Sequence, residues 1–216
     1  MLEARIRKIY PNIVREYFQN KEDLSISLKH ALKCSVFNQG CDGGYAYLIM
    51  KFFNEFEMVL DKCFSQENGC QKKCKDPKLE KLQLSVKDYK YIGGSYGKCS
   101  EDAIIKEVYE NGPIVASLEP DYGFMFYKSG IYHSPNVFAQ KSQDSKPEWE
   151  KVDHSMALVG WGEEEINDQI VKYWILQNSW GSSWGDKGYM KLLRGTDHLG
   201  IESICESAIP IINEIK

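Results

Sequence analysis

QNSWGSSWGDKGY, residues 177–189, is the stretch of this sequence that says most about its fold and chemistry. Asn178 directly follows VKYWIL (171–176), a run of β-branched and aromatic residues that is typical of a strand. Asn–Ser and Trp–Gly pairs could simply form a turn, but each tryptophan must bury a large ring. An asparagine carbonyl can instead accept a hydrogen bond from a histidine ring and fix its orientation, and an indole above that contact would exclude water. The stretch therefore predicts either a plain turn or the orienting residue of a catalytic histidine.

His154 is the histidine that we expect Asn178 to orient. It stands at the start of DHSMALVGWG (153–162), which reads as a strand. The end of a strand at the boundary between two lobes suits a catalytic base, in the logic of a nucleophile, a base and an orienting group. A lone histidine is more often structural or merely exposed, and we give that interpretation to the other three, His30, His133 and His198.

The sequence separates into a helical first part and a strand-rich second part. Helical patterns cover 1–10, 27–33, 41–56 and 100–111, the last with Ser100 as its N-cap and Gly112–Pro113 as its stop signal. Runs typical of antiparallel strands follow at 114–119, 156–162, 171–178 and 188–193. We therefore expect an α+β fold with a mainly helical lobe over 1–112 and a mainly β lobe over 113–216. The polar stretch 134–153 is expected to be an exposed loop or a processing site.

Composition and charge argue against several classes of function. The net charge is −4, and charges of both signs are interleaved without the basic stripe that nucleic-acid binding needs. No apolar run reaches the roughly 18–20 residues of a membrane span. The start, LEARIR, lacks the apolar core of a signal peptide. We expect no nucleic-acid partner and no membrane span, and a secreted or lysosomal protein would have its targeting segment outside this chain.

The seven cysteines favour an oxidising compartment. Five lie within residues 34–74 in loop-like sequence, the pattern of a disulfide framework. Zinc is the less favoured alternative, because Cys70 and Cys74 have a spacing close to that of metal ligands but lack the second pair of a structural site. We therefore expect no metal and no organic cofactor. The odd count leaves at least one cysteine without a partner inside the chain.

These motifs resemble those of the papain family of cysteine peptidases. QNSWGSSWGDKGY resembles the family's asparagine motif, DHSMALVGWG its histidine motif, and GCDGGYAYLI (40–49) its substrate-binding glycine segment. MLEARIRK, YIGGSYGKC, RGTDHLGIES and AIPII resemble the catalytic part of the family's cathepsin C group, which are lysosomal dipeptidyl peptidases. The likeness covers essentially the whole chain, apart from a longer loop near 136–152. It implies a two-lobe papain-like fold, a peptide or protein substrate, and a lysosomal, secretory or vacuolar location.

The resemblance also implies roles for individual residues. His154 would be the catalytic imidazole, Asn178 its orienting residue, Trp180 the shield, and Asp153 a neighbour on the leaving-group side. Backbone recognition of substrate would fall to Gly43 and Gly44, since a glycine permits close approach, and Ile201 would lie in the pocket for the second substrate residue. Tyr47 and Tyr91 match the tyrosine positions of a chloride site, so a bound chloride ion is implied.

For the cysteines, the resemblance implies two disulfides and three unpaired thiols. The pairs would be Cys34–Cys70 and Cys63–Cys74. Cys41, Cys99 and Cys205 would be unpaired, the first because its usual partner lies close to the nucleophile.

The resemblance places the nucleophilic cysteine outside this chain. MLEARIR resembles the continuation of the nucleophile's helix, so that cysteine would lie roughly two turns upstream of Met1. We therefore expect an N-terminally truncated peptidase domain that is inactive alone and monomeric, without the exclusion domain that makes the parent oligomeric and confines it to removing dipeptides. The alternatives are a papain-like pseudoenzyme that serves as a binding or scaffold module, a separate chain that supplies the nucleophile helix, and a start codon assigned to an internal methionine.

Overall fold

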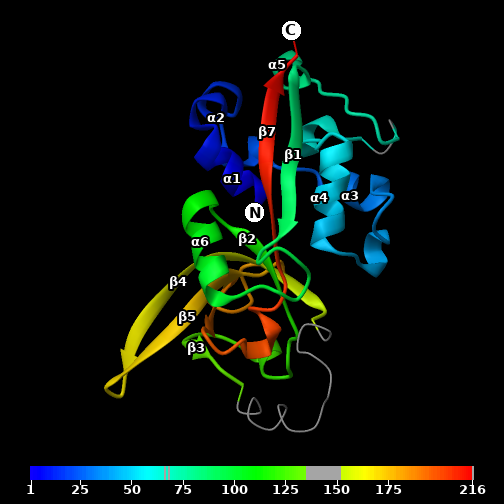
Figure 1. The fold of residues 1–216 in the computed structure, drawn as a ribbon. Helices are drawn as coiled ribbons and strands as arrows, with labels where there is room; N and C mark the ends of the chain where they lie inside the picture. Colours follow the sequence, from blue (N-terminus) through cyan, green and yellow to red (C-terminus); the bar gives the residue numbers. More distant parts are fainter. Residues whose placement is uncertain (66, 68, 135–151, 216) are drawn as a thin grey trace. The chain divides into compact units, whose positions relative to one another are not determined.

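The computed structural model describes residues 1–65, 67, 69–134 and 152–215 (Figure 1). Nearly all of the predicted loop 134–153 lies outside these residues. The chain forms two units, each described by itself below. Unit 1 comprises Met1 and Lys90–Glu206, and unit 2 comprises Leu2–Tyr89 and Ser207–Lys216. Strands β1 (Leu82–Tyr91) and β7 (Cys205–Glu214) run from one unit into the other. Helices combine with a mostly antiparallel sheet, so the predicted α+β class is confirmed.

Unit 2 holds most of the helices. They are α1 (Leu2–Ile9), α2 (Pro11–Tyr17), α3 (Leu28–Cys34), α4 (Ala46–Glu55) and α5 (Pro77–Glu80), with short 3-10 turns at Lys21–Leu24, Gly40–Asp42 and Asp61–Cys63. Helices α1 and α2 lie on one side of the β1 and β7 strands, and α3 and α4 on the other (Figure 1). The Asn54 side chain at the end of α4 fixes that helix to β1 through a 2.8 Å hydrogen bond to the Val86 carbonyl.

Helix α1 ends at Ile9, and Pro11 takes the first turn of α2, where a missing N–H costs little. Leu2 and Ile6 on this helix are buried, whereas Ile9 is 40% exposed. The fully buried cation Arg5 was not anticipated. Its Nη1 donates a 3.1 Å hydrogen bond to the carbonyl of Ala208 in β7, which ties the N-terminal helix to the last strand.

Two disulfides cross-link unit 2 in the pairing that the resemblance implies. Cys34 is bonded to Cys70 and Cys63 to Cys74, with Cα–Cα distances of 5.7 and 4.1 Å. The zinc alternative does not hold for Cys70 and Cys74, because both sulfurs are in disulfides. The remaining three thiols are free, with Cys41 exposed, Cys99 partly exposed and Cys205 buried.

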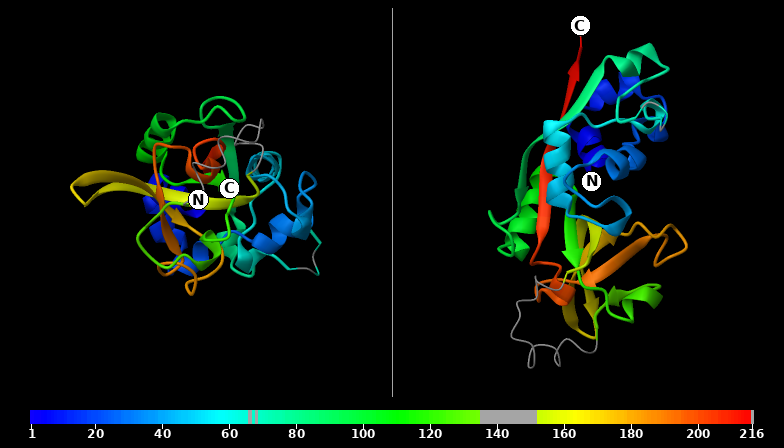
Figure 2. Two further views of the ribbon diagram at one scale, coloured as in Figure 1. Left: turned by 90° about the horizontal axis from the view of Figure 1, so that it is seen from below. Right: turned by 90° about the vertical axis from the view of Figure 1, so that its right-hand side faces the viewer.

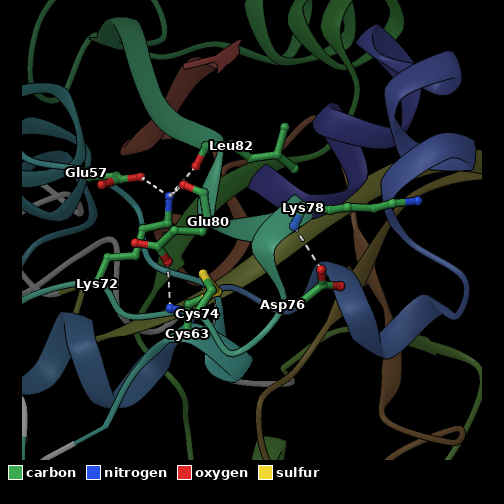
Figure 3. Close-up of a disulfide and its surroundings, with 8 residues drawn as sticks. All are labelled: Glu57, Cys63, Lys72, Cys74, Asp76, Lys78, Glu80 and Leu82. Carbon is green, nitrogen blue, oxygen red and sulfur yellow. Dashed lines mark hydrogen bonds and ion pairs between the residues drawn. A yellow bond between two sulfur atoms is a disulfide. The ribbon is translucent and has the colours of Figure 1, made fainter. Parts of the chain in front are cut away.

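Lys72 organises the segment next to the second disulfide (Figure 3). Its ammonium donates to the Glu57 carboxylate at 3.0 Å, to the Glu80 carbonyl at 3.0 Å and to the Leu82 carbonyl. The Glu80 carboxylate in turn accepts from the Cys74 N–H at 2.6 Å. A lysine-rich loop in the sequence is thus held by one lysine whose side chain is only 10% exposed.

Unit 1 is built on the sheet. Its strands are β2 (Ile114–Leu118), β3 (Ile131–Tyr132), β4 (His154–Ile166), β5 (Gln169–Gln177) and β6 (Tyr189–Leu193), and the complete sheet order is β1-β7-β2-β4-β5-β6-β3. The predicted antiparallel arrangement holds for β2–β4, β4–β5, β5–β6 and β2–β7, whereas β3 pairs with β6 in parallel. The sequence did not indicate β1, β3 or β7.

The β4–β5 hairpin extends beyond the other strands of unit 1 (Figures 1 and 2). Its register pairs Ile166 with Gln169, so the loop has only two residues, Asn167 and Asp168. Both have positive φ, of 53° and 61°, which is the conformation that a tight hairpin turn demands and that Asn and Asp tolerate. The two-residue turn sets the register as far as the pair Gly160–Ile175, beyond which a β-bulge between Leu158 and Gly160 shifts it.

Helix α6 (Glu101–Asn111) covers the sheet in unit 1 and is capped as predicted. Ser100 Oγ accepts from the Ala103 N–H at 3.3 Å, and Gly112 ends the helix at a φ of +94°. The sequence placed this segment in a helical lobe over 1–112, whereas here it belongs to the strand-rich unit. One apolar core joins helix and sheet, and among its members are Ile104, Val108, Ile114, Leu118, Leu158 and Trp174.

Candidate active site

The ends of two neighbouring strands bring His154 and Asn178 together in unit 1. β4 begins at His154, which lies opposite Leu118 of β2. β5 ends at Gln177, which lies opposite Ala157 of β4, so the next residue falls beside the first residues of β4. The Asn178 N–H donates to the Gly188 carbonyl at 2.9 Å, which fixes the chain after the strand. Sheet register therefore places two side chains that are 24 residues apart.

A hydrogen bond of 2.9 Å joins His154 Nε2 to Asn178 Oδ1. The same oxygen accepts from the Ser179 N–H at 2.8 Å, so the amide is held by the backbone that follows it. An oxygen acceptor requires the proton on Nε2, which makes Nδ1 the basic nitrogen of the neutral ring. Asn178 is 8% exposed, so the contact is largely removed from water. The asparagine thus selects the tautomer and orientation that a catalytic imidazole needs.

Aromatic rings surround the histidine. The Trp180 ring lies 4.9 Å from the His154 ring between centroids, and the Phe124 ring lies 6.0 Å from it in an edge-on arrangement. Trp184 supports both, with centroids 5.5 Å from Trp180 and 5.1 Å from Phe124. Trp180 itself is 38% exposed, so it covers the polar contact on its solvent side. The tryptophans thus form the wall around a polar contact that the sequence predicts.

Phe124 was missed by sequence reasoning. It lies in the 3-10 turn Phe124–Phe126, inside an aromatic run, YGFMFY (122–127), that carries no motif. Its N–H donates to Asp121 Oδ1 at 2.8 Å, and the Tyr132 hydroxyl donates to the same oxygen. Burial acts to raise the pKa of Asp121, but hydrogen bonds from Ser134, Tyr132 and the Phe124 N–H together hold that pKa below its ordinary value. An ionised carboxylate therefore fixes the turn that carries Phe124.

Among the described residues, no hydrogen bond joins the other three histidines to Asn178. His198 is fully buried, and its Nε2 accepts from the Ser134 N–H at 2.8 Å. Burial lowers the pKa of His198. His30 is buried in unit 2 beside Phe52 and Phe64, and His133 is exposed.

The two glycines assigned to substrate recognition lie in unit 2, between a 3-10 turn and α4. Gly43 has a φ of +112°, which disfavours any side chain. A Cβ on Gly44 would lie 2.2 Å from Asn38 Oδ1, an atom that accepts from the Tyr45 N–H at 2.9 Å. Asn38 was not noticed in the sequence, where it is one polar residue in a polar loop. It shapes the segment, and the substrate role of the glycines stays a prediction.

The remaining predicted residues are spread over both units. Ile201 is fully buried in the core of unit 1, and Asp153 is exposed beside His154. Tyr91 contacts Tyr96 in unit 1, with ring centroids 5.4 Å apart, and Tyr47 contacts Tyr89 in unit 2, with ring centroids 4.9 Å apart. The chloride site that requires both Tyr47 and Tyr91, and the pocket assigned to Ile201, stay predictions.

The chain belongs to the papain family of cysteine proteases, whose family model matches residues 12–209. It is 33% identical to dipeptidyl aminopeptidase 1 of Plasmodium falciparum, over 88% of this chain and 36% of that protein. It is 34% identical to cathepsin C of Schistosoma mansoni, over 98% of this chain and 44% of that protein. The chain therefore spans less than half the length of these curated relatives.

Two further comparisons extend this picture. Tubulointerstitial nephritis antigen-like of Mus musculus is 30% identical, over 82% of this chain and 42% of that protein. The solved structure of digestive procathepsin L 3 from the larval midgut of Tenebrio molitor superposes with a TM-score of 0.64 at 20% identity, covering 96% of this chain and 62% of that one. This likeness confirms the papain-like fold. None of the helices in the described part of the chain has the length and apolarity that crossing a bilayer requires.

Proposed function

We propose that His154 and Asn178 are the base and the orienting residue of a Cys–His–Asn peptidase that releases dipeptides. The observation that carries this proposal is the 2.9 Å hydrogen bond from His154 Nε2 to Asn178 Oδ1, covered by Trp180. The relatives named dipeptidyl aminopeptidase 1 and cathepsin C support the substrate class.

The proposed reaction uses Nδ1, the ring nitrogen of His154 that does not bond to Asn178. With Nε2 engaged by Asn178, Nδ1 accepts the proton of a cysteine thiol and holds the resulting thiolate as an ion pair. The thiolate attacks the peptide carbonyl, and His154 then donates its proton to the leaving amine. Water, deprotonated by the same ring, hydrolyses the acyl-enzyme. Because Trp180 and Phe124 lower the local dielectric, the His154–Asn178 hydrogen bond is stronger than it would be in water.

None of the seven cysteines is proposed as the nucleophile, so this chain alone is expected to show no turnover. Four are in disulfides, Cys205 is buried, and Cys41 is in unit 2 within the 3-10 turn Gly40–Asp42 rather than at the start of an α-helix. Cys99 precedes the N-cap of α6, but its sulfur faces the Ser100 carbonyl and Cys205. Within the described residues, no hydrogen bond joins a cysteine to His154.

The compartment and the ion belong to the same proposal. Two disulfides favour folding in an oxidising compartment, which agrees with a lysosomal, secretory or vacuolar location.

A chloride ion would be held by the hydroxyls of Tyr47 and Tyr91. Chloride titration of the thermal unfolding of the chain, with Tyr47→Phe as the altered variant, tests that site.

A papain-like binding or scaffold module is the second candidate. The observation that favours it is the mouse relative whose name, tubulointerstitial nephritis antigen-like, describes no peptidase. The intact His154–Asn178 contact favours the peptidase instead, because a module that only binds has no need of an oriented imidazole.

A fluorogenic dipeptide assay on the purified chain, with His154→Ala as the matched control, tests the assignment of the cysteines. The expected result is the same background rate for both proteins. Turnover that disappears in His154→Ala would contradict it and would place the nucleophile among the seven cysteines. An N-acetylated form of the same substrate then separates dipeptide release, which needs a free amino terminus, from internal cleavage.

Two further measurements test the peptidase assignment itself. Nitrogen-15 NMR of His154 should show the proton on Nε2, and Asn178→Ala should weaken that preference; a proton on Nδ1 would contradict the mechanism. The coding sequence on the 5′ side of the Met1 codon provides the second test. An in-frame cysteine codon about two helical turns upstream supports the peptidase, and an in-frame stop supports the binding module.

A further inference from the structure

We propose that Cys99 and Cys205 are a disulfide-forming pair, which makes unit 1 the site of a third, oxidisable cross-link. Neither cysteine takes part in the proposed peptidase chemistry, so the proposal is independent of it.

The backbone brings the two cysteines to the same short segment. The Ile92 N–H donates to the Cys205 carbonyl at 2.8 Å, which places the start of β7 beside residue 92. The next residue, Gly93, has a φ of +89°, and a Cβ there would lie 3.0 Å from the Cys99 Cα. Cys205 thus lies beside Ile92 and Cys99 beside Gly93, the two residues that directly follow β1.

The side chains complete this arrangement. Cys99 packs against the apolar core that contains Cys205, and its side chain acts to raise the pKa of the Cys205 thiol. Their other contacts are weak, since Cys205 Sγ lies 3.4 Å from the Ile201 carbonyl and Cys99 Sγ lies 4.0 Å from the Ser100 carbonyl. Thiols are poor hydrogen-bond donors, so a disulfide would displace little.

Cys99 and Cys205 differ in exposure, and this difference decides which of the two thiols reacts first. Cys205 is 1% exposed, and burial, together with the neighbouring Cys99 side chain, raises the pKa of its thiol. Cys99 is partly exposed and is the sulfur that a small reagent reaches first.

The oxidant is a low-molecular-weight disulfide such as oxidised glutathione. The Cys99 thiolate attacks one sulfur of the reagent, its S–S bond breaks, and a mixed disulfide forms while one small thiol leaves. Cys205 then attacks the Cys99 sulfur, gives up its proton and releases the second small thiol. Two protein thiols are oxidised, one reagent disulfide is reduced to two thiols, and no other reactant is required.

The folding compartment and the position of the two cysteines in the chain both favour a Cys99–Cys205 disulfide. Unit 2 already carries two disulfides, so the compartment in which the chain folds supports their formation. A Cys99–Cys205 bond would join the segment before α6 to the start of β7, and it would close a loop of roughly 100 residues, the range in which a cross-link restricts the unfolded chain most.

The test uses the full chain with Cys41→Ser, so that the exposed third thiol cannot interfere. The folded protein is treated with oxidised glutathione, denatured, alkylated and analysed as an intact mass and as non-reduced peptides. The expected result is the loss of both alkylatable thiols, a peptide that contains Cys99 joined to Cys205, and an increase in Tm of roughly 5 °C or more.

Two variants keep the test decisive. Cys99→Ser should leave Cys205 unreacted because it is buried, whereas Cys205→Ala should leave Cys99 as a stable glutathione adduct. If neither variant folds, trapping the native protein with glutathione for increasing times still distinguishes the mixed disulfide from the internal one. A Cys99–glutathione adduct that never resolves, or two thiols that remain alkylatable after oxidation, would overturn the proposal.

Discussion

The two units of this chain differ in the interactions that stabilise each of them beyond its apolar core. Unit 1 has a continuous apolar core from helix and sheet, with Trp174, Phe124 and Ile201 fully buried. Unit 2 also buries apolar side chains, among them Ile6, Leu24 and Phe52, and supplements them with polar contacts and covalent bonds. Two disulfides lie there, together with a buried Arg5 and a nearly buried Lys72, each bonded to backbone carbonyls. The described cysteines of unit 1 carry no disulfide.

This difference indicates which unit can hold catalytic side chains in an accurate position. The His154–Asn178 contact depends on strand register and on packed aromatic rings, all within unit 1. The loop before α4 can present a backbone, as Gly43 and Gly44 would, but an imidazole needs its partners on rigid elements. The contrast predicts that damage to the core of unit 1 disturbs His154 most, and that damage to unit 2 acts first on local order.

Removal of Trp174 should have the largest effect. Trp174→Ala leaves a cavity in a fully buried position and takes away the donor of a 2.9 Å hydrogen bond to Glu202, so we expect a loss of about 3–5 kcal/mol. Chemical denaturation measures it, and the NMR signals of His154 should change in the same variant. Trp174→Phe keeps most of the ring volume and should cost less. Unchanged His154 signals in a clearly destabilised alanine variant would break the link between core and site.

Removal of the Cys34–Cys70 bond should come next. The two cysteines are 36 residues apart, so replacing both by alanine is expected to cost about 3–4 kcal/mol. The matched control is Cys63→Ala with Cys74→Ala, whose bond spans only 11 residues and should cost less. Hydrogen exchange should rise first around α3 and the 61–80 segment. A rise at β4 and β5 of equal size would show that the units are not distinct in stability.

The sequence could predict those parts of the fold and the site that rest on local signals. Ser100, Gly112 and the β4–β5 strands follow from caps and patterns, and the Asn178 motif is readable because tryptophans flank an asparagine after a strand. β7 was hidden by Pro210, since a proline inside a run argues against a strand.

Other features depend on contacts that no local pattern reveals. Phe124 reaches His154 from a loop 30 positions away, and its aromatic run carries no motif. Arg5 and Lys72 look like solvated charges in a helix and a loop, and contacts such as those with the Ala208 carbonyl and the Glu57 carboxylate explain their burial. The proximity of Cys99 and Cys205 requires the placement of β7 beside Ile92.

Replacement of Lys72 should have a smaller effect, confined to unit 2. Lys72→Met keeps the length of the side chain but leaves the Glu57 carboxylate and two carbonyls without their donor, so we expect a loss of about 1–3 kcal/mol. Lys75→Met is the control, because Lys75 is an exposed lysine in the same loop. Equal Tm values for the two variants would mean that the Lys72 contacts add nothing beyond those of a surface lysine.

Acidification gives the smallest effect and acts on one buried histidine in each unit. Burial lowers the pKa of His198 in unit 1, with Asp121 opposing that shift, and lowers the pKa of His30 in unit 2, with a hydrogen bond from its ring to the backbone of Cys70 opposing it. A histidine whose folded pKa is lowered binds fewer protons in the folded state than in the unfolded state. Its contribution to stability is therefore complete above the unfolded value of 6.5 and is lost as the pH falls below it.

The slope is at most about 1.4 kcal/mol per pH unit for each histidine, and it levels off below the folded pKa. Denaturation curves recorded between pH 7 and pH 5 measure this fall in the free energy of unfolding, to which each histidine contributes about one titration step. His198→Gln should flatten the dependence for unit 1 and His30→Gln for unit 2, as read from exchange at β5 and at α4 respectively. If His198→Gln flattened the dependence at α4 as strongly as at β5, the two units would respond to acid as a single cooperative body, because protonation in one core would then unfold the other.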